Sequence, residues 1–301
     1  MADTIIDKFE MEEAAPGIFR LILKKMWQLR LGVVGIALII VLIITALFCP
    51  FIAPEDPYEQ DIMQRLLPPS WMKGGTPEHL LGTDHLGRDL LTRIMYGTRV
   101  SLVVGIMAVI LEVFIGVGLG LLAGYYGGKT DSVISFMVNV MMSFPFILLA
   151  LTLVAVLGPS LQNIIIALGL TGWPVFTRVT RIETMKLRDQ EFVMAATTLA
   201  FKHTRIMIRH ILPNLVPIIL VLGTVEVARA IIRETILSFL GLGIQPPIPS
   251  WGSMLAEGRD YMLMQWWLAA FPGAAIFISA LGINLMGDAL RDLMDPHLRK
   301  S

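Results

Sequence analysis

Long apolar stretches alternate with polar segments along this chain. The apolar stretches are 31–54, 100–128, 132–177, 213–240 and 261–287. A bilayer core needs roughly 20 helical residues per crossing, and the third stretch is about twice that long. Gly158-Pro159-Ser160 interrupts this stretch, and Gly and Pro are turn formers. The pattern therefore predicts an all-α, polytopic membrane protein with six transmembrane helices.

Composition supports a membrane protein. Hydrophobic residues make up 55% of the chain and charged residues 16%, with a mean hydropathy of +0.71. Soluble domains are about 25% charged, so we expect the excess apolar surface to face lipid. The formal net charge is zero, which gives no reason to expect a nucleic-acid partner. The single cysteine, Cys49, excludes an internal disulfide, and we predict a buried, unreactive thiol.

Lys and Arg in the loops predict the orientation. The N-terminal flank is basic, and segment 178–212 carries seven basic residues against three acidic ones. By contrast, segment 55–93 carries seven acidic residues against four basic ones. Because an even number of spans puts both termini on the same side, we expect both termini in the cytoplasm and segment 55–98 outside.

These patterns define the predicted domains. Residues 1–30 form a cytoplasmic N-terminal segment, 31–287 a six-span domain with its core at about 98–287 and a cytoplasmic loop at 178–212, and 288–301 a cytoplasmic tail. The first apolar run is longer than the roughly 7–15 residues of a signal-peptide core, so we interpret it as a retained span. In the second span, small residues recur as Gly116, Gly120 and Gly124, a spacing that favours close helix packing over a pore constriction.

Sequence motifs for catalysis are not matched. Gly127-Gly128-Lys129-Thr130 resembles the end of a phosphate-binding loop, but Ala123 occupies the required first glycine position and a membrane helix precedes it. No nucleophile elbow or H-E-x-x-H helix is found. We therefore predict that the chain has no catalytic residues, hydrolyses no ATP and is not an enzyme.

The histidines do not predict a metal site. His79 and His85, with Asp84 and Asp89 nearby, offer ligands in a loop, but their spacing matches no metal motif. We therefore expect no bound metal and no cofactor in this chain. His203 and His210 lie in the basic segment, where we interpret them as loop or interface residues.

A short amphipathic helix is predicted in segment 178–212. Phe192, Ala195, Ala196 and Leu199 share one helical face. Small alanines beside a phenylalanine suit a helix that presses closely against a partner protein. An amphipathic helix on the lipid surface is the alternative.

This segment resembles the coupling loop of ABC importer permeases, whose pattern is E-A-A-x-x-x-G, a spacer and L-P. The paired alanines fall on Ala195 and Ala196, whereas Met194 replaces the family's Glu and Ala200 its Gly. Loss of that Gly predicts a weaker break between the two short helices. The resemblance implies these ATPase-coupling residues: Glu191, Phe192, Ala195, Ala196, Leu199 and Ala200.

Three further stretches are similar to dipeptide and oligopeptide permeases. They are His79-Leu80-Leu81-Gly82-Thr83-Asp84-His85-Leu86-Gly87-Arg88-Asp89, the run 237–252, and the C-terminal run 284–296. The resemblance implies a multi-pass subunit of the bacterial inner membrane. Its expected partners are a second homologous permease, two ABC ATPase subunits that bind ATP and Mg²⁺, and an extracytoplasmic peptide-binding protein. Nickel-chelate and glutathione importers share the pattern and remain alternatives for the substrate.

Charged residues interrupt the fifth span. They are Glu226, Arg229, Arg233 and Glu234. Each costs about 2.5–3.5 kcal/mol in a membrane helix on insertion scales, so we expect them to face protein or water. Glu112 in the second span is a candidate partner. The stripe forms either internal salt bridges and contacts to the second permease, or a lining of the translocation pathway that handles the charged termini of a peptide.

Other classes of function are weaker alternatives. Ion-coupled secondary transporters usually show inverted repeats and broken helices around ion sites. The two halves of this sequence show no convincing repeat. A channel or a membrane enzyme is a third class, and a static channel would not need the amphipathic cytoplasmic helix.

Overall fold

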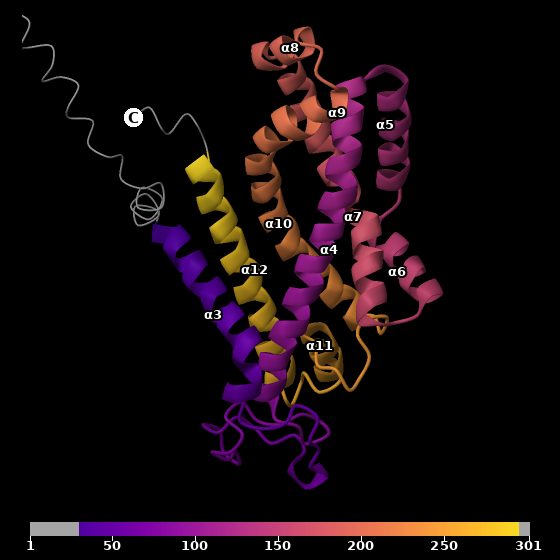
Figure 1. Ribbon diagram of the computed structural model, residues 1–301. Coiled ribbons are helices and arrows are strands. Elements are labelled where there is room, and N and C mark those ends of the chain that lie inside the picture. The colour runs from indigo at the N-terminus through magenta and orange to yellow at the C-terminus, as the bar shows by residue number, and fades with distance from the viewer. Residues whose placement is uncertain (1–29, 295–301) are drawn as a thin grey trace, which may run out of the picture.

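The computed structural model describes residues 30–294, which are helical apart from loops, turns and one isolated bridge. The elements are α3 (Arg30–Ile52), the short 3₁₀ turn η1 (Ile62–Gln64), α4 (Leu90–Tyr126), α5 (Gly128–Ser143), α6 (Phe146–Leu157), α7 (Leu161–Arg188), α8 (Glu191–Thr198), α9 (His203–Ile206), the π-helical turn η2 (Met207–Ile211), α10 (Leu212–Phe239), α11 (Trp251–Arg259) and α12 (Trp267–Met294). Figure 1 shows the long helices side by side. The predicted all-α fold is confirmed. The basic N-terminal flank and the end of the tail lie outside the described residues.

Within residues 30–294, four helical stretches are long and apolar enough to cross a membrane. They are Leu31–Ile52, Leu90–Tyr126, His203–Phe239 and Trp267–Met294. The α5–α6 pair qualifies as a fifth if its two bent parts count as one span. Helix α7 has 28 residues, about 42 Å at 1.5 Å per residue. It packs against α4 in the bundle (Figure 1) and corresponds to the remaining predicted span.

The third predicted span is not one straight helix. Helices α5 and α6 meet at an angle of 88°. Pro145 stands at the break, and Phe144 before it is extended at φ −90° and ψ 139°. A proline disfavours helical geometry in the residue before it, which explains the bend. The predicted turn at Gly158 is confirmed, because Gly158 has φ +87° and the Ser160 side chain caps α7.

Two helices begin at other residues than the predicted spans do. Helix α4 begins at Leu90 rather than Val100, because the Asp89 side chain accepts a hydrogen bond from the Thr92 backbone N–H at 2.7 Å and caps the helix there. Helix α12 begins at Trp267 rather than Tyr261, because residues 261–264 form tight turns. Polar residues such as Arg93 and Arg99 hide the start of α4 from a hydropathy pattern, and the apolar residues of the turn at 261–264 extend the apolar run before α12.

The glycines of α4 bring it close to α7, as their spacing predicts. A Cβ atom on Gly120 would lie 2.7 Å from the Thr177 carbonyl oxygen, and one on Gly124 would lie 2.6 Å from the Arg181 carbonyl oxygen. Gly116 faces Phe176 in the same way. The two backbones therefore approach closely enough to exclude any side chain at these positions.

The two ends of the bundle differ. Residues 53–89, called here the cap segment, fold beneath α3, α4 and α11 at one end, and α8 and α9 lie at the other end (Figure 1). Cys49, near the cap segment, is fully buried, as predicted. Helix α7 continues to Arg188, so much of segment 178–212 is helical rather than a loop.

Candidate functional site

Helix α8 stands at the end of the bundle opposite the cap segment. Val193 and Ala196 are buried against Ile206 and Met207. Phe192, Ala195 and Leu199, which the sequence predicts on one face, are exposed, as are Glu191 and Ala200. Ala196 thus departs from the predicted face, because it anchors α8 to the rest of the chain.

The break after α8 persists although Ala200 replaces the family's glycine. Ala200 adopts a left-handed conformation with φ +56°, which an L-residue with a Cβ enters at a cost of about 1–2 kcal/mol. The expected weakening of this break is therefore not seen. Phe201 then turns back, its backbone N–H donating to the Ala196 carbonyl oxygen at 3.2 Å, and the Arg205 guanidinium stacks on its ring at 4.3 Å.

Helices α8 and α9 are fixed to the end of α4. The Tyr125 hydroxyl and His203 Nδ1 lie 2.8 Å apart, within hydrogen-bond distance. Arg188 donates to the carbonyl oxygens of Gly124 and Tyr125 at 3.4 and 3.3 Å. His203 is therefore an anchoring residue between elements. Because α9 leads through η2 directly into α10, α9 connects α8 to both α4 and α10.

A charged network joins α10 to α4 within the bundle. Glu226 accepts from Arg229 at 2.7 Å and lies 3.2 Å from Arg233. Arg233 also reaches Glu112 of α4 at 3.6 Å, and its guanidinium lies 4.3 Å from the centre of the Phe146 ring of α6. The structure thus brings together four of the five residues that the sequence predicts for the pathway.

The members of this network differ in exposure. Glu112 and Glu226 are fully buried, whereas the Arg229 side chain is 55% exposed and the Arg233 side chain 19% exposed. Glu234 lies apart, fully buried, and accepts a hydrogen bond from the Ser238 hydroxyl at 2.6 Å. The arrangement contains the internal salt bridge that was one of the two predicted alternatives. It leaves the Arg229 guanidinium accessible.

A cavity of about 260 Å³ adjoins the network at the bend between α5 and α6. Its walls include Phe144, Phe146, Thr171, Pro174 and Arg233. Apolar walls with one cationic group provide a surface that can hold an organic molecule with a negative terminus.

A second buried ionic network ties the cap segment to α4 and α11, and no sequence pattern predicts it. Arg93 pairs with Asp84 and with Glu257 at 2.8 Å, and Arg88 pairs with the same two carboxylates at 2.7 and 3.0 Å. Burial acts to raise the pKa of Asp84, but Arg93 and Arg88 outweigh it and hold this pKa below its usual value. The ionised Asp84 carboxylate therefore stabilises the folded state fully above about pH 4, its pKa in the unfolded chain. This stabilisation is lost as the pH falls through the lower pKa of the folded state.

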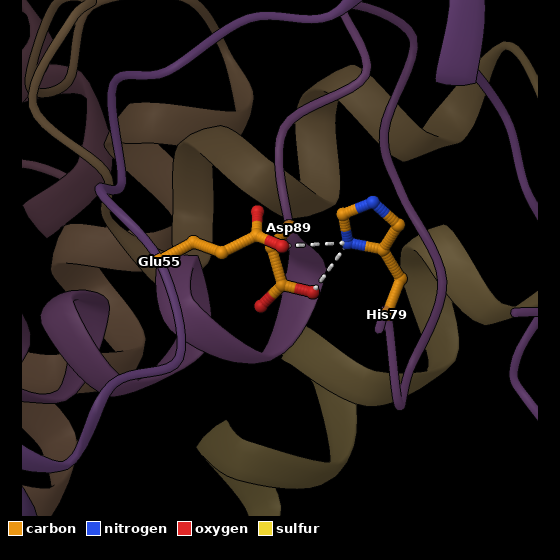
Figure 2. A group of neighbouring side chains, drawn as sticks. All are labelled: Glu55, His79 and Asp89. Carbon is orange, nitrogen blue, oxygen red and sulfur yellow. Dashed lines mark hydrogen bonds and ion pairs between the residues drawn. The ribbon is translucent and has the colours of Figure 1, made fainter. Parts of the chain in front are cut away.

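A third cluster lies in the cap segment. Figure 2 shows the carboxylates of Glu55 and Asp89 converging on one ring nitrogen of His79. Nδ1 of His79 is 3.3 Å from Glu55 Oε1 and 3.2 Å from Asp89 Oδ1. Burial raises the pKa of the Glu55 carboxyl. Of the four loop residues considered as metal ligands, His79 and Asp89 meet here, while His85 approaches Glu257 at 3.9 Å.

Comparison with known proteins decides the family. The model of the "binding-protein-dependent transport system inner membrane component" matches residues 116–300. The "N-terminal TM domain of oligopeptide transport permease C" matches residues 17–69. This chain belongs to the dipeptide and oligopeptide family of ABC importer permeases.

Curated relatives match almost the whole permease. It is 42% identical over 283 residues to the di/tripeptide transport system permease protein DppC of Pseudomonas aeruginosa, covering 93% of each chain. It is 38% identical over 276 residues to the probable D,D-dipeptide transport system permease protein DdpC of Escherichia coli, covering 91% of each. The inward-facing MetNI methionine ABC transporter has a chain of the same fold, with a TM-score of 0.55, 18% identity, and coverage of 67% of this permease and 97% of that chain.

These comparisons confirm several predictions. The permease is a transmembrane subunit of an ABC importer, a multi-pass protein of the bacterial inner membrane that acts with other transporter subunits. Its family is one of transport permeases and not a catalytic enzyme family. The alternative of an ion-coupled secondary transporter is set aside by this membership.

Proposed function

We propose that this permease forms half of an ATP-driven import pathway for di- or oligopeptides. Its partners in this proposal are a second homologous permease, two ATPase subunits that bind ATP and Mg²⁺, and an extracytoplasmic peptide-binding protein. The observation that carries the proposal is α8, a short helix that exposes apolar side chains at one end of the bundle. The names of the relatives, which specify dipeptides and tripeptides, support the substrate class.

Helix α8 has the properties of a protein-docking element. Phe192 is 42% exposed, Met194 53% and Leu199 68%, and the small Ala195 lies between them. An interfacial helix on lipid typically carries Lys or Arg on its polar face, whereas α8 carries only the acidic Glu191. The composition therefore favours a groove on an ATPase over the lipid surface as the site that α8 occupies.

The connections of α8 support its role in coupling. Val193 and Ala196 hold it against the α9–η2 segment, which continues into α10. The charged network lies on α10, so closure of the ATPases would move α8 and tilt the helix that carries Arg229 and Arg233. In this proposal, that movement alternates access to the pathway between the two sides of the membrane.

The orientation follows from the same assignment. The α8 end faces the cytoplasm, and both termini lie there, in agreement with the basic residues of segment 178–212. The cap segment then lies outside, where a peptide-binding protein can reach it. Seven acidic residues between Glu55 and Arg93 fit this side.

The exposed guanidinium of Arg229 is the proposed contact for the peptide carboxylate. Its side chain is 55% exposed although Glu226 holds it at 2.7 Å. Arg233, which belongs to the same network, lines the 260 Å³ cavity. Glutathione is itself a peptide, so import of glutathione would use the same recognition, and a nickel chelate with free carboxylates remains the less direct alternative.

Substitution of Ala195 tests the coupling proposal. Ala195→Glu places a large charged group on the exposed face of α8, so we expect it to uncouple the ATPases, with overpacking that costs about 1–3 kcal/mol at the contact. The readouts are co-purification of ATPase subunits in mild detergent and ATPase activity stimulated by the loaded binding protein. Both should fall, since this cost weakens the contact about 5- to 150-fold.

Ala195→Ser is the matched control, because it keeps a small side chain at the same position and should behave as the wild type. The melting temperature of both variants should match the wild type, since Ala195 is exposed. Normal subunit assembly together with normal stimulation in Ala195→Glu would show that α8 is not the docking element.

A further inference from the structure

The His79 cluster directs one imidazole nitrogen and two carboxylates at a common point. Nε2 of His79 lies 2.9 Å from Gln64 Oε1. The Gln64 amide is oriented by its other end, because its Nε2 donates to Asp61 Oδ2 at 3.0 Å. The Gln64 oxygen therefore accepts, and Nε2 of His79 carries the proton. In the neutral ring, Nδ1 then presents a lone pair toward Glu55 and Asp89, both of which are acceptors when ionised.

A cation at the centre of this group would satisfy all three side chains. The side chain of His79 is 6% exposed and that of Asp89 1% exposed. Water therefore screens poorly the repulsion between the Nδ1 lone pair and the carboxylates. Among residues 30–294, Glu55 and Asp89 form ion pairs with His79 but with no Lys or Arg. The neighbouring carboxylates Asp84 and Glu257 differ, because Arg88 and Arg93 neutralise them.

The distances favour a metal ion over an extra proton on His79. A charge-assisted N–H···O hydrogen bond is about 2.7–2.9 Å long, and one N–H shared between two carboxylates is well aligned with neither. The observed separations are 3.2 and 3.3 Å. Zn²⁺ with bonds of about 2.0–2.2 Å to N and O in a tetrahedron separates its ligand atoms by about 3.4 Å. The three ligand atoms lie within 4.8 Å of one another, so one ion can reach all of them.

We propose that Glu55, His79 and Asp89 bind a divalent transition-metal ion, with Zn²⁺ the best match, through one imidazole nitrogen and two carboxylate oxygens. Imidazole among the ligands favours a transition metal over Mg²⁺ or Ca²⁺, which prefer oxygen alone. Glu55 is 31% exposed, so the ion enters from the Glu55 side. On the same side, a water molecule can complete the coordination shell as the fourth ligand.

The surroundings are arranged as in known metal sites. A metal-bound histidine generally donates its other N–H to a fixed acceptor, and Gln64 supplies that acceptor here. Asp61 in turn orients Gln64 while its other oxygen accepts from the Met63 backbone N–H at 2.9 Å. The second oxygen of Asp89 caps α4 at 2.7 Å. His79 and Asp89 are thus each held in place by a contact that the metal does not use.

Bound metal would fasten three parts of the chain together. Glu55 follows α3, His79 lies in the middle of the cap segment, and Asp89 starts α4. The ion would therefore hold the cap segment on the bundle. This role is structural and does not depend on which solute the permease transports.

Zn²⁺ binding to the full-length chain tests the proposal. The protein, purified in detergent and stripped of metal with a chelator, is incubated with Zn²⁺ alone, passed through a desalting column and analysed for metal by mass spectrometry. We expect about one tightly held Zn²⁺ per chain and a melting temperature that rises with Zn²⁺, since a ligand that binds the folded state stabilises it.

Variants locate the site. Glu55→Gln and His79→Gln remove a ligand and should abolish the retained Zn²⁺ and the rise in melting temperature. His85→Gln is the matched control in the same loop and should keep both. Gln64→Ala removes only the hydrogen-bond partner of His79 and should weaken Zn²⁺ binding about 10–100-fold.

Two results would overturn the proposal. One is wild-type protein that retains no Zn²⁺, which would show that the three side chains do not form a metal site. The other is equal retention in the wild type and in Glu55→Gln, which would place the metal elsewhere. Glu55→Gln guards against misfolding as an explanation, because Glu55 is partly exposed and the substitution preserves its size.

Discussion

Glu226→Ala is expected to destabilise the folded permease by about 3–5 kcal/mol, the usual cost of breaking a buried ion pair. The carboxylate is fully buried and lies 2.7 Å from Arg229 and 3.2 Å from Arg233. Without the Glu226 carboxylate, the one acidic partner that Arg233 keeps among residues 30–294 is Glu112, at 3.6 Å. A carboxylate left alone can take up a proton, but a guanidinium cannot lose one in a protein, so the membrane helix retains an uncompensated charge.

The measurement is the melting temperature in detergent together with the yield of the protein in membranes. Arg229→Ala is the matched control, because its side chain is 55% exposed and Glu226 keeps Arg233 as a partner at 3.2 Å, so no buried charge loses its only partner. That variant should fold normally and change peptide selectivity if Arg229 contacts the peptide carboxylate. A Glu226→Ala protein as stable as the wild type would contradict the structural role of the network.

The double variant Glu226→Ala with Arg233→Ala separates the pair from its surroundings. Removal of both partners leaves no unpaired guanidinium at position 233, so the double variant should be less unstable than the sum of the single variants. If the loss of stability in the double variant equals the sum of the two single losses, the two side chains do not interact in the folded protein.

Gly120→Ala is expected to destabilise the protein by about 1–3 kcal/mol through overpacking. Its new Cβ would meet the Thr177 carbonyl oxygen and the Thr180 Cβ, both at 2.7 Å. These atoms belong to the backbone of α7 and to the base of a side chain, so a rotamer change cannot relieve the contact. Helices α4 and α7 must move apart, and both the melting temperature and the assembly with other subunits should fall.

Gly118→Ala, two positions away on the same helix, is the matched control. Its Cβ would have nothing within 4 Å, and alanine favours a helix over glycine by about 1 kcal/mol. The control should therefore melt at or slightly above the wild-type temperature. Equal melting temperatures for Gly118→Ala and Gly120→Ala would show that the close α4–α7 contact is absent in solution.

The helices, the turn at Gly158 and the close packing at Gly116, Gly120 and Gly124 were predictable because they depend on local chain properties. Apolar length determines whether a segment can cross a bilayer, and four-residue spacing determines which side chains share a helix face. The bend at Pro145 was missed, although its cause is visible in the sequence. A long apolar run concealed the effect of a single proline.

The ionic clusters were less predictable because their members come from distant parts of the chain. Arg88 and Glu257 are 169 positions apart, and no local pattern relates them. The stripe on α10 was visible from its spacing, and its partner Glu112 was suggested because it is the one charge in its span. Glu55 could not be assigned to His79 and Asp89, since only the path of the cap segment brings it there.

Uptake of a radiolabelled dipeptide into proteoliposomes tests the central claim most directly. The permease is reconstituted with its co-expressed partner subunits, and the binding protein is supplied on the side of the cap segment. We predict accumulation that requires Mg·ATP on the side of α8 and that Ala195→Glu abolishes while Ala195→Ser preserves it. Accumulation driven by an ion gradient without ATP, or ATP-driven uptake unaffected by Ala195→Glu, would contradict the account.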